Sequence, residues 1–204
     1  MESGKKNDLV SWAHSRVPGM QSLGSFVKLL SERRLAVLFV IAAAVLLFFF
    51  WGYVKTLAMM AFFIVLGAVS MIYNRWLKLS LGVEFIMLGV VITSVVSGRL
   101  PGLVVGIIGL FLAELISERF TYSTFVSFIG IAVVALIAPN VIHQTNSITS
   151  TGIILTVVYD AVIIPGYLLL GSSIGRSALF VVTHIAFNVW AFSFLAPIFI
   201  SVLS

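Results

Sequence analysis

The sequence predicts an all-α protein, a polytopic transmembrane helical bundle of six or seven spans. Two features of composition support this fold class: 61% of the 204 residues are hydrophobic, and only 9% are charged. Soluble domains contain about 45–50% apolar and about 25% charged residues. The third observation is a series of apolar runs, most of them close to the roughly 20 residues that a helix needs to cross a bilayer. The lipid bilayer is therefore the first partner that the sequence predicts.

The N-terminal segment, residues 1–34, is polar and basic and holds half of the Lys and Arg residues of the chain. Basic residues beside a membrane are typical of a surface anchor and of a topology signal. Residues 20–30 carry apolar side chains at mixed helical spacing, which favours either an interfacial helix or a disordered tail. We therefore divide the chain into a basic cytoplasmic segment, 1–34, and a transmembrane helical domain, 35–204.

The apolar part of the chain divides into seven candidate spans, of which the third and fourth are short. The spans are 35–53, 57–73, 81–96, 100–116, 125–142, 153–170 and 178–203. The longest polar connection that this division leaves is residues 139–152.

The turn "SGRLPG" joins the third and fourth predicted spans so tightly that we expect an antiparallel helix pair. Pro101 stands near the start of the fourth helix, where its missing N–H costs nothing. Gly102 and Gly106 form a GxxxG step, which lets helix backbones approach closely. This step indicates helix packing.

The distribution of Lys and Arg predicts the orientation of the chain in the membrane. With the N-terminus in the cytoplasm, ten of the twelve basic residues lie on the inner side, and only Lys55 and Arg99 lie outside. We therefore expect a multi-pass protein of the cell membrane with a cytoplasmic N-terminus. Seven spans would place the C-terminus outside.

Asp160 is the sharpest candidate for a functional residue, because it lies well inside the sixth predicted span next to Tyr159. An unpaired carboxylate at that depth is costly or stays protonated. Asp160 is either a ligand contact, an ion or proton site, a partner for His184, or a hydrogen-bonded strut between helices. Pro165 and Gly166, one turn further on, favour a kink, and broken helices often line cavities in transporters.

The stretch "VVTHIAFNVW" places His184 and Asn188 four residues apart in the last span, so they share one helix face. The predicted helix boundaries set Asn188 closer in depth to Asp160 than His184 is. A polar cluster between the last two helices is one interpretation, and simple helix packing through hydrogen bonds is the other.

Glu114 and Glu84 lie close to the ends of the fourth and third predicted spans. Carboxylates in such positions usually reach the membrane surface or pair with a nearby base, which for Glu114 would be Arg119. Both are therefore interpreted mainly as boundary charges, with Glu114 kept as a secondary site residue.

Several chemistries find no support in the sequence. The chain has no cysteine, which excludes disulfides, thiolate metal sites and a Cys nucleophile. Patterns for zinc hydrolases, nucleophile elbows and P-loops are absent. We therefore predict no catalytic residue, no cofactor and no metal site. The net charge of +5 is concentrated near the membrane and does not indicate a nucleic-acid partner. Active transport would need an ion gradient or a partner ATPase.

The stretch from Asn74 to Ile116, and within it "GRLPGLVVGIIG", resembles the substrate-capture (S) components of energy-coupling-factor vitamin transporters. The matching positions are Pro101, Gly102, Gly106 and Gly109. This resemblance implies a six-helix bundle over residues 57–204 that binds a small molecule and works with an energising membrane and ATPase complex. It implies no particular ligand.

Two other families resemble parts of the chain. MreD-type proteins, which are membrane partners in cell-shape machinery, are similar in size and in this same region. "HIAFN" resembles the His-x-x-x-Asn element of CAAX-type intramembrane proteases, although the Glu-Glu pair of that family is missing here.

These observations predict a small-molecule binding and transport subunit similar to an S component, with a pocket between helices that opens to the outside. The predicted ligand-binding residues are Asp160, Asn188, His184, Tyr159 and Glu114. The first alternative is a non-catalytic interaction subunit of a membrane complex, as in MreD. The second is an intramembrane hydrolase, in which His184 would be essential.

Overall fold

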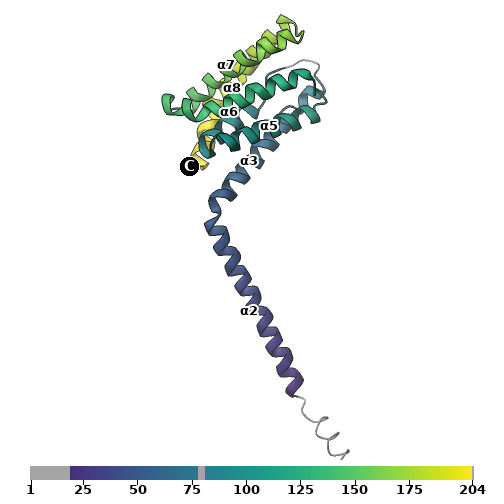
Figure 1. Cartoon of the computed structure of the whole chain (residues 1–204), viewed down its shortest axis with the longest axis vertical. Helices are drawn as coiled ribbons and strands as arrows, with labels where there is room; N and C mark the ends of the chain where they lie inside the picture. The colour runs from purple at the N-terminus through teal and green to yellow at the C-terminus, as the bar shows by residue number, and fades with distance from the viewer. Residues whose placement is uncertain (1–18, 78–80, 204) are drawn as a thin grey trace, which may run out of the picture. The chain divides into compact units, whose positions relative to one another are not determined.

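The computed structural model describes residues 19–77 and 81–203. The described residues are all-α and include a helical membrane bundle, as predicted (Figure 1). Within these ranges the helices are α2 (Gly19–Phe49), α3 (Trp51–Ser70), the 3-10 helix η1 (Ile72–Arg75), α4 (Ile86–Ser97), α5 (Arg99–Ile116), α6 (Tyr122–Thr145), α7 (Ile148–Leu169) and α8 (Ile174–Leu203). Five of the segments are long and apolar enough to cross a membrane: Trp51–Arg75, α5, α6, α7 and α8.

The chain divides into two compact units, Met1–Gly52 and Tyr53–Ser204. Helix α2 continues without a break across the predicted boundary between residues 34 and 35. The first 18 residues of the predicted basic segment lie outside the described residues. All of the features discussed below belong to the second unit, whose helices gather in one bundle in Figure 1.

Helices α4 and α5 form the antiparallel pair that the sequence predicts. Gly98 between them has a φ of 99°, a conformation that favours glycine. Gly102 lies against Ser94, and Gly106 lies against Val90, so residues pair in opposite order along the two helices. A Cβ atom on either glycine would overlap these neighbours, which explains why the GxxxG step is needed for close packing.

Helix α4 is the centre of the bundle. It contacts α5, α6, α7 and α8, and its residues from Ile86 to Ser94 are all buried. Its 12 residues span about 18 Å at about 1.5 Å per residue, which is well short of a hydrocarbon core of about 30 Å. The predicted span 81–96 is therefore a short helix that is preceded by non-helical backbone over residues 81–85. Hydrocarbon tolerates such backbone only where protein surrounds it.

Side-chain hydroxyl groups hold this non-helical segment, residues 81–85, in place. They come from α3, η1 and α8. The hydrogen bonds are Phe85 N–H to Ser70 Oγ (3.1 Å), Tyr73 O–H to the Leu81 carbonyl (2.6 Å) and Gly82 N–H to Thr183 Oγ1 (2.9 Å). The segment thus replaces helical hydrogen bonds with bonds to side chains, which satisfies part of its backbone inside the bundle.

Replacement of Thr183 by Val should destabilise the protein by about 1–3 kcal/mol, because the Gly82 N–H then loses its acceptor in a buried place. The matched control is Thr156→Val, since among the described residues the Thr156 hydroxyl bonds only to the Gly152 carbonyl of its own helix. Unfolding free energies in mixed micelles would measure both changes. Equal losses in the two variants would show that the Gly82 bond adds nothing.

The predicted polar connection 139–152 is wrong, because most of it is helical. Helix α6 continues to Thr145, and α7 begins at Ile148, so only Asn146 and Ser147 join them. Asn146 has a φ of 52°, which Asn tolerates better than most residues, and Ser147 caps α7 by accepting a hydrogen bond from the Ser150 N–H. Polar residues here end the helices, and they do not form a long loop.

Candidate functional site

The imidazole of His184 lies between two carboxylates inside the bundle. Its Nδ1 is 2.8 Å from Asp160 Oδ1, a hydrogen bond, and its Nε2 is 3.6 Å from Glu84 Oε1. The second distance is too long for a hydrogen bond but short enough for an ion pair. His184 is fully buried, and Asp160 and Glu84 are 4% and 6% exposed. We call Glu84, Asp160 and His184 the carboxylate–histidine cluster.

Three different elements supply this cluster: α7 carries Asp160, α8 carries His184, and the non-helical segment carries Glu84. Gly82 allows the segment to reach α8. A Cβ atom at Gly82 would overlap the Cα and backbone N of His184, so a larger residue would push the segment 81–85 away from α8. The close approach at Gly82 therefore places Glu84 beside the imidazole.

Asp160 pairs with His184, which was one of the alternatives predicted for Asp160, although the predicted boundaries had set Asn188 closer to it in depth. Asp160 and His184 are equally far in sequence from Ser172, and so are Gly152 and Phe192, which also face each other. The turn between the helices is therefore centred on Ser172. The predicted boundaries centred it two residues later, because they began the last helix at residue 178 and not at Ile174. The Asn188 side chain instead donates to the His184 carbonyl, four residues earlier in the same helix.

Two aromatic rings cover the imidazole. Phe180 stacks on it, with ring centroids 5.1 Å apart and planes at 21°, and Tyr159 lies 5.3 Å away at 52°. These rings and the surrounding apolar helices shield the cluster from water. The shielding strengthens the attraction between the imidazole and its carboxylates, and it raises the cost of any polar atom that lacks a partner.

Four polar atoms at the cluster are buried without a hydrogen-bond partner among the described residues. They are Glu84 Oε1, Asp160 Oδ2, His184 Nε2 and Asn188 Oδ1. Among the same residues, no three His, Asp or Glu side chains are arranged to hold a metal ion. The geometry explains this, because the two carboxylates lie at opposite nitrogens of one ring and do not converge on a common point.

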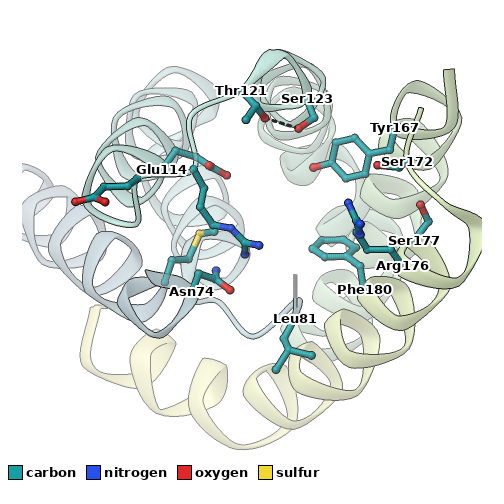
Figure 2. A pocket seen from close by; sticks show the side chains of 13 residues that line it. Asn74, Leu81, Glu114, Thr121, Ser123, Tyr167, Ser172, Arg176, Ser177 and Phe180 are labelled. Atoms are coloured by element: carbon teal, nitrogen blue, oxygen red, sulfur yellow. Dashed lines mark hydrogen bonds between the residues drawn. The ribbon is translucent and has the colours of Figure 1, made fainter. Parts of the chain in front are cut away.

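A cavity of about 410 Å³ lies beside the cluster, at the end of the bundle where the chain passes from α3 to α4, from α5 to α6 and from α7 to α8. Figure 2 shows Asn74 and Glu114 on one side of this cavity, facing Tyr167, Arg176 and Phe180 across it. Phe180 belongs to both sites, since it lines the cavity and stacks on His184.

Of the predicted ligand-binding residues, only Glu114 lines this cavity. Asp160, His184, Asn188 and Tyr159 are buried behind its wall. Four further residues of the site, Glu84, Asn74, Tyr167 and Arg176, were not among those predicted. Glu84 was interpreted as a boundary charge because its segment was predicted as a helix end, and Arg176 was used only as a topology charge.

Two residues of α7 lie at the cavity and at the cluster. Tyr167 lines the cavity, and its hydroxyl is 2.5 Å from Ser127 Oγ. Tyr159, two turns earlier in the same helix, lies with its ring against His184. The cavity and the cluster are thus neighbouring parts of one polar region.

An ion pair stands at the rim of the cavity, where Arg75 Nη2 is 2.6 Å from Glu118 Oε1. Both side chains are more than half exposed, at 54% and 66%. Exposed pairs of this kind contribute about 0–1 kcal/mol. The pair therefore adds little to stability, and it serves below as a control for the buried cluster.

The fold and the site together define a class: a helical membrane protein with a polar cavity at one end of its bundle and a carboxylate–histidine cluster behind it. No protein-family model, curated protein or solved structure matches the chain. The function is therefore inferred below from the geometry and from the resemblance stated above.

Proposed function

We propose that this protein is an integral membrane subunit that binds a small molecule and takes part in its transport, similar to an S component. The observation that carries this proposal is the polar cavity. Its volume of about 410 Å³ lies within the range of about 300–1,000 Å³ that is typical of ligand sites. The size suits a small metabolite.

Two cavity residues have buried polar atoms that lack a partner among the described residues: Asn74 Oδ1 and Ser177 Oγ. Both residues are 5% exposed. A buried polar atom without a hydrogen bond costs about 1–3 kcal/mol. A ligand that bonds these atoms would remove that cost, which favours binding of a polar molecule over a purely apolar one.

The charges at the cavity narrow the ligand class. Arg176 faces the cavity from one side and Glu114 from the other (Figure 2). A guanidinium group binds carboxylate or phosphate, whereas a carboxylate accepts hydrogen bonds from amines and amides. We propose a ligand that carries both an anionic group and an N–H or O–H donor.

The orientation of the cavity follows from the predicted topology. The connections around the cavity are those that the distribution of Lys and Arg places in the cytoplasm. With a cytoplasmic N-terminus in the cell membrane, the cavity faces the cytoplasm. The sequence had predicted a pocket that opens to the outside. The protein would then present or release its ligand on the inner side, and a partner complex or an ion gradient would drive the cycle.

The double variant Asn74→Leu with Ser177→Val should bind the small molecule roughly tenfold more weakly, since two hydrogen bonds of about 0.5–1.5 kcal/mol each are removed. Mass spectrometry of small molecules that co-purify with the protein would measure the loss. The matched control is Thr93→Val, which removes another buried hydroxyl without a described partner, outside the cavity lining.

Equal amounts of bound molecule in the double variant and the control would contradict the assignment of the cavity. Arg176→Gln tests the anionic group, because its loss should weaken only ligands that carry negative charge. A preparation that contains no small molecule but a constant protein partner would instead favour the interaction subunit.

A further inference from the structure

We propose that the carboxylate–histidine cluster is a proton-binding site whose exchangeable proton resides on Glu84 and exchanges with water in the cavity. This inference goes beyond the proposed function and does not depend on it, because it rests on the buried cluster alone. The ligand of this site is the proton itself.

Charge within the cluster is the first reason. With both carboxylates ionised and a neutral imidazole, Glu84, Asp160 and His184 carry two negative charges in a buried place. One proton on the imidazole reduces the net charge to one, and a second proton makes the cluster neutral. Because a net charge inside a bilayer is costly, the cluster favours the uptake of this second proton.

The two distances show where the second proton resides. Asp160 Oδ1 lies 2.8 Å from His184 Nδ1, which is the length of a charge-assisted hydrogen bond that stabilises an ionised carboxylate. Glu84 Oε1 lies 3.6 Å from Nε2, so it receives weaker stabilisation. It has no hydrogen-bond partner among the described residues. Glu84 is therefore the carboxylate that is protonated first.

The other titratable groups around Glu84 support this assignment. Besides His184, the titratable groups on the surrounding elements are Tyr73 of η1, whose hydroxyl bonds the Leu81 carbonyl of the same segment, Tyr159 of α7, whose ring lies against His184, and Glu114 and Tyr167, which line the cavity. When Glu114 is ionised, its negative charge disfavours ionisation of Glu84. The tyrosines are neutral at ordinary pH, so they provide no positive charge that would stabilise an ionised Glu84. Asp160 adds a further carboxylate on the far side of the imidazole. Arg119 interacts with Glu114 and Tyr73.

Two connections bring the cavity to the cluster. Leu81 lines the cavity at the start of the short segment that carries Glu84. Phe180 lines the cavity with one part of its side chain and stacks on the imidazole, so the cavity reaches the ring that covers the cluster. A proton from cavity water therefore has a short path to the buried carboxylate.

Infrared difference spectroscopy of the purified full chain tests the proposal with the proton as the only probe. Spectra taken at about pH 6 and about pH 9 exclude exposed carboxyl groups, which have pKa values of about 4 and stay ionised throughout. We expect a band of a protonated carboxylic acid to appear at the lower pH. The spectra are recorded in a Glu114→Gln background, because Glu114 is a second, partly buried carboxyl group at the cavity and would give a band of its own. Added Glu84→Gln should remove the remaining band, whereas added Glu118→Gln, which changes an exposed carboxylate at the cavity rim, should leave it.

Absence of any band in the Glu114→Gln background, or survival of the band when Glu84→Gln is added to it, would each overturn the proposal. None of these results depends on a bound small molecule, so failure here is distinguishable from failure of the proposed function.

Isotope labels keep the test valid if Glu84→Gln does not fold. In the Glu114→Gln protein with carboxyl-labelled glutamate the band should shift to lower frequency, and with labelled aspartate it should stay. The opposite result would place the proton on Asp160 and overturn the assignment. Transfer to heavy water should shift the band promptly, whereas a band that persists unchanged would refute exchange with the cavity.

Discussion

His184→Phe should lower the free energy of unfolding by about 3–5 kcal/mol, the usual cost of removing one partner from a buried ion pair. Phenylalanine keeps an aromatic ring against Phe180 and fills a similar volume, so packing changes little. Both ring nitrogens are lost, and with them the hydrogen bond to Asp160 and the ion pair with Glu84. Two buried carboxylates would then face an apolar ring.

A rescue experiment separates charge from packing. Adding Glu84→Gln and Asp160→Asn to His184→Phe removes both carboxylates, and this triple variant should recover most of the lost stability, because uncharged groups cost less to bury than ions. Thermodynamic cycles over the single and combined variants would measure the coupling. Arg75→Gln is the control, since it breaks an exposed pair and should change stability by about 0–1 kcal/mol.

If His184→Phe were as mild as Arg75→Gln, the buried cluster would carry no ionic interaction. If the triple variant were no better than His184→Phe alone, the loss would come from packing. Either outcome would remove the electrostatic description of the cluster.

Gly82→Ala should be the most damaging glycine-to-alanine change in the second unit. It should lower the free energy of unfolding by about 1–3 kcal/mol, because the added methyl group overpacks the site. The added Cβ would overlap backbone atoms of His184. Backbone in a helix cannot turn aside as a side chain can. The strain would instead displace the non-helical segment and move Glu84 away from the imidazole.

The matched control for Gly82→Ala is Gly175→Ala, because a Cβ atom at Gly175 meets nothing within 4 Å. That variant should be neutral or slightly stabilising, since alanine favours a helix more than glycine does. Thermal unfolding of both variants would measure the difference. Similar stabilities would show that the segment can move at little cost and that Gly82 does not fix the position of Glu84.

Gly82→Ala also makes a distinct spectroscopic prediction. If the segment moves, the carboxylic acid band assigned to Glu84 should shift or broaden in this variant, while Gly175→Ala should leave it unchanged. A stability loss without any spectral change would show that the cluster adapts to the displacement.

Much of the fold could be predicted from the sequence, because membrane helices depend mainly on the composition and length of apolar runs. The pairing of α4 with α5 was predicted from the tight turn "SGRLPG" between them, which is a local feature of the sequence. Asp160, His184 and Asn188 were predicted as notable because ionisable or amide groups rarely occur in apolar runs. All three are buried in the structure.

The partners of these residues could be predicted only in part. His184 was one of the predicted alternatives for the partner of Asp160, but the predicted start of the last helix, at residue 178 and not at Ile174, set Asn188 closer to Asp160 in depth. The position of Glu84 depends on a non-helical segment that is held by hydroxyl groups distant in sequence, such as that of Thr183. No local pattern encodes such contacts, so the carboxylate–histidine cluster appears only in three dimensions.

The residues that line the cavity could not be predicted from the sequence for the same reason. In the sequence, Asn74 stands out only as a neutral polar residue beside an apolar run, and Ser177 does not stand out. Their buried, unpartnered atoms come together only when η1 and α8 close the end of the bundle. Glu114 was found because a carboxylate near an apolar run attracts notice by itself.

The shortness of α4 has a consequence for the biogenesis of the protein. A helix of 12 residues that follows a non-helical segment is not stable in lipid alone, since the backbone groups of that segment would lack hydrogen-bond partners. Thr183, which bonds the Gly82 N–H, and His184, which faces Glu84, lie on the last helix. The segment 81–97 is therefore synthesised before these two partners, although Ser70 and Tyr73, which bond the same segment, already exist. The contacts at the centre of the bundle are complete only when α8 has been made.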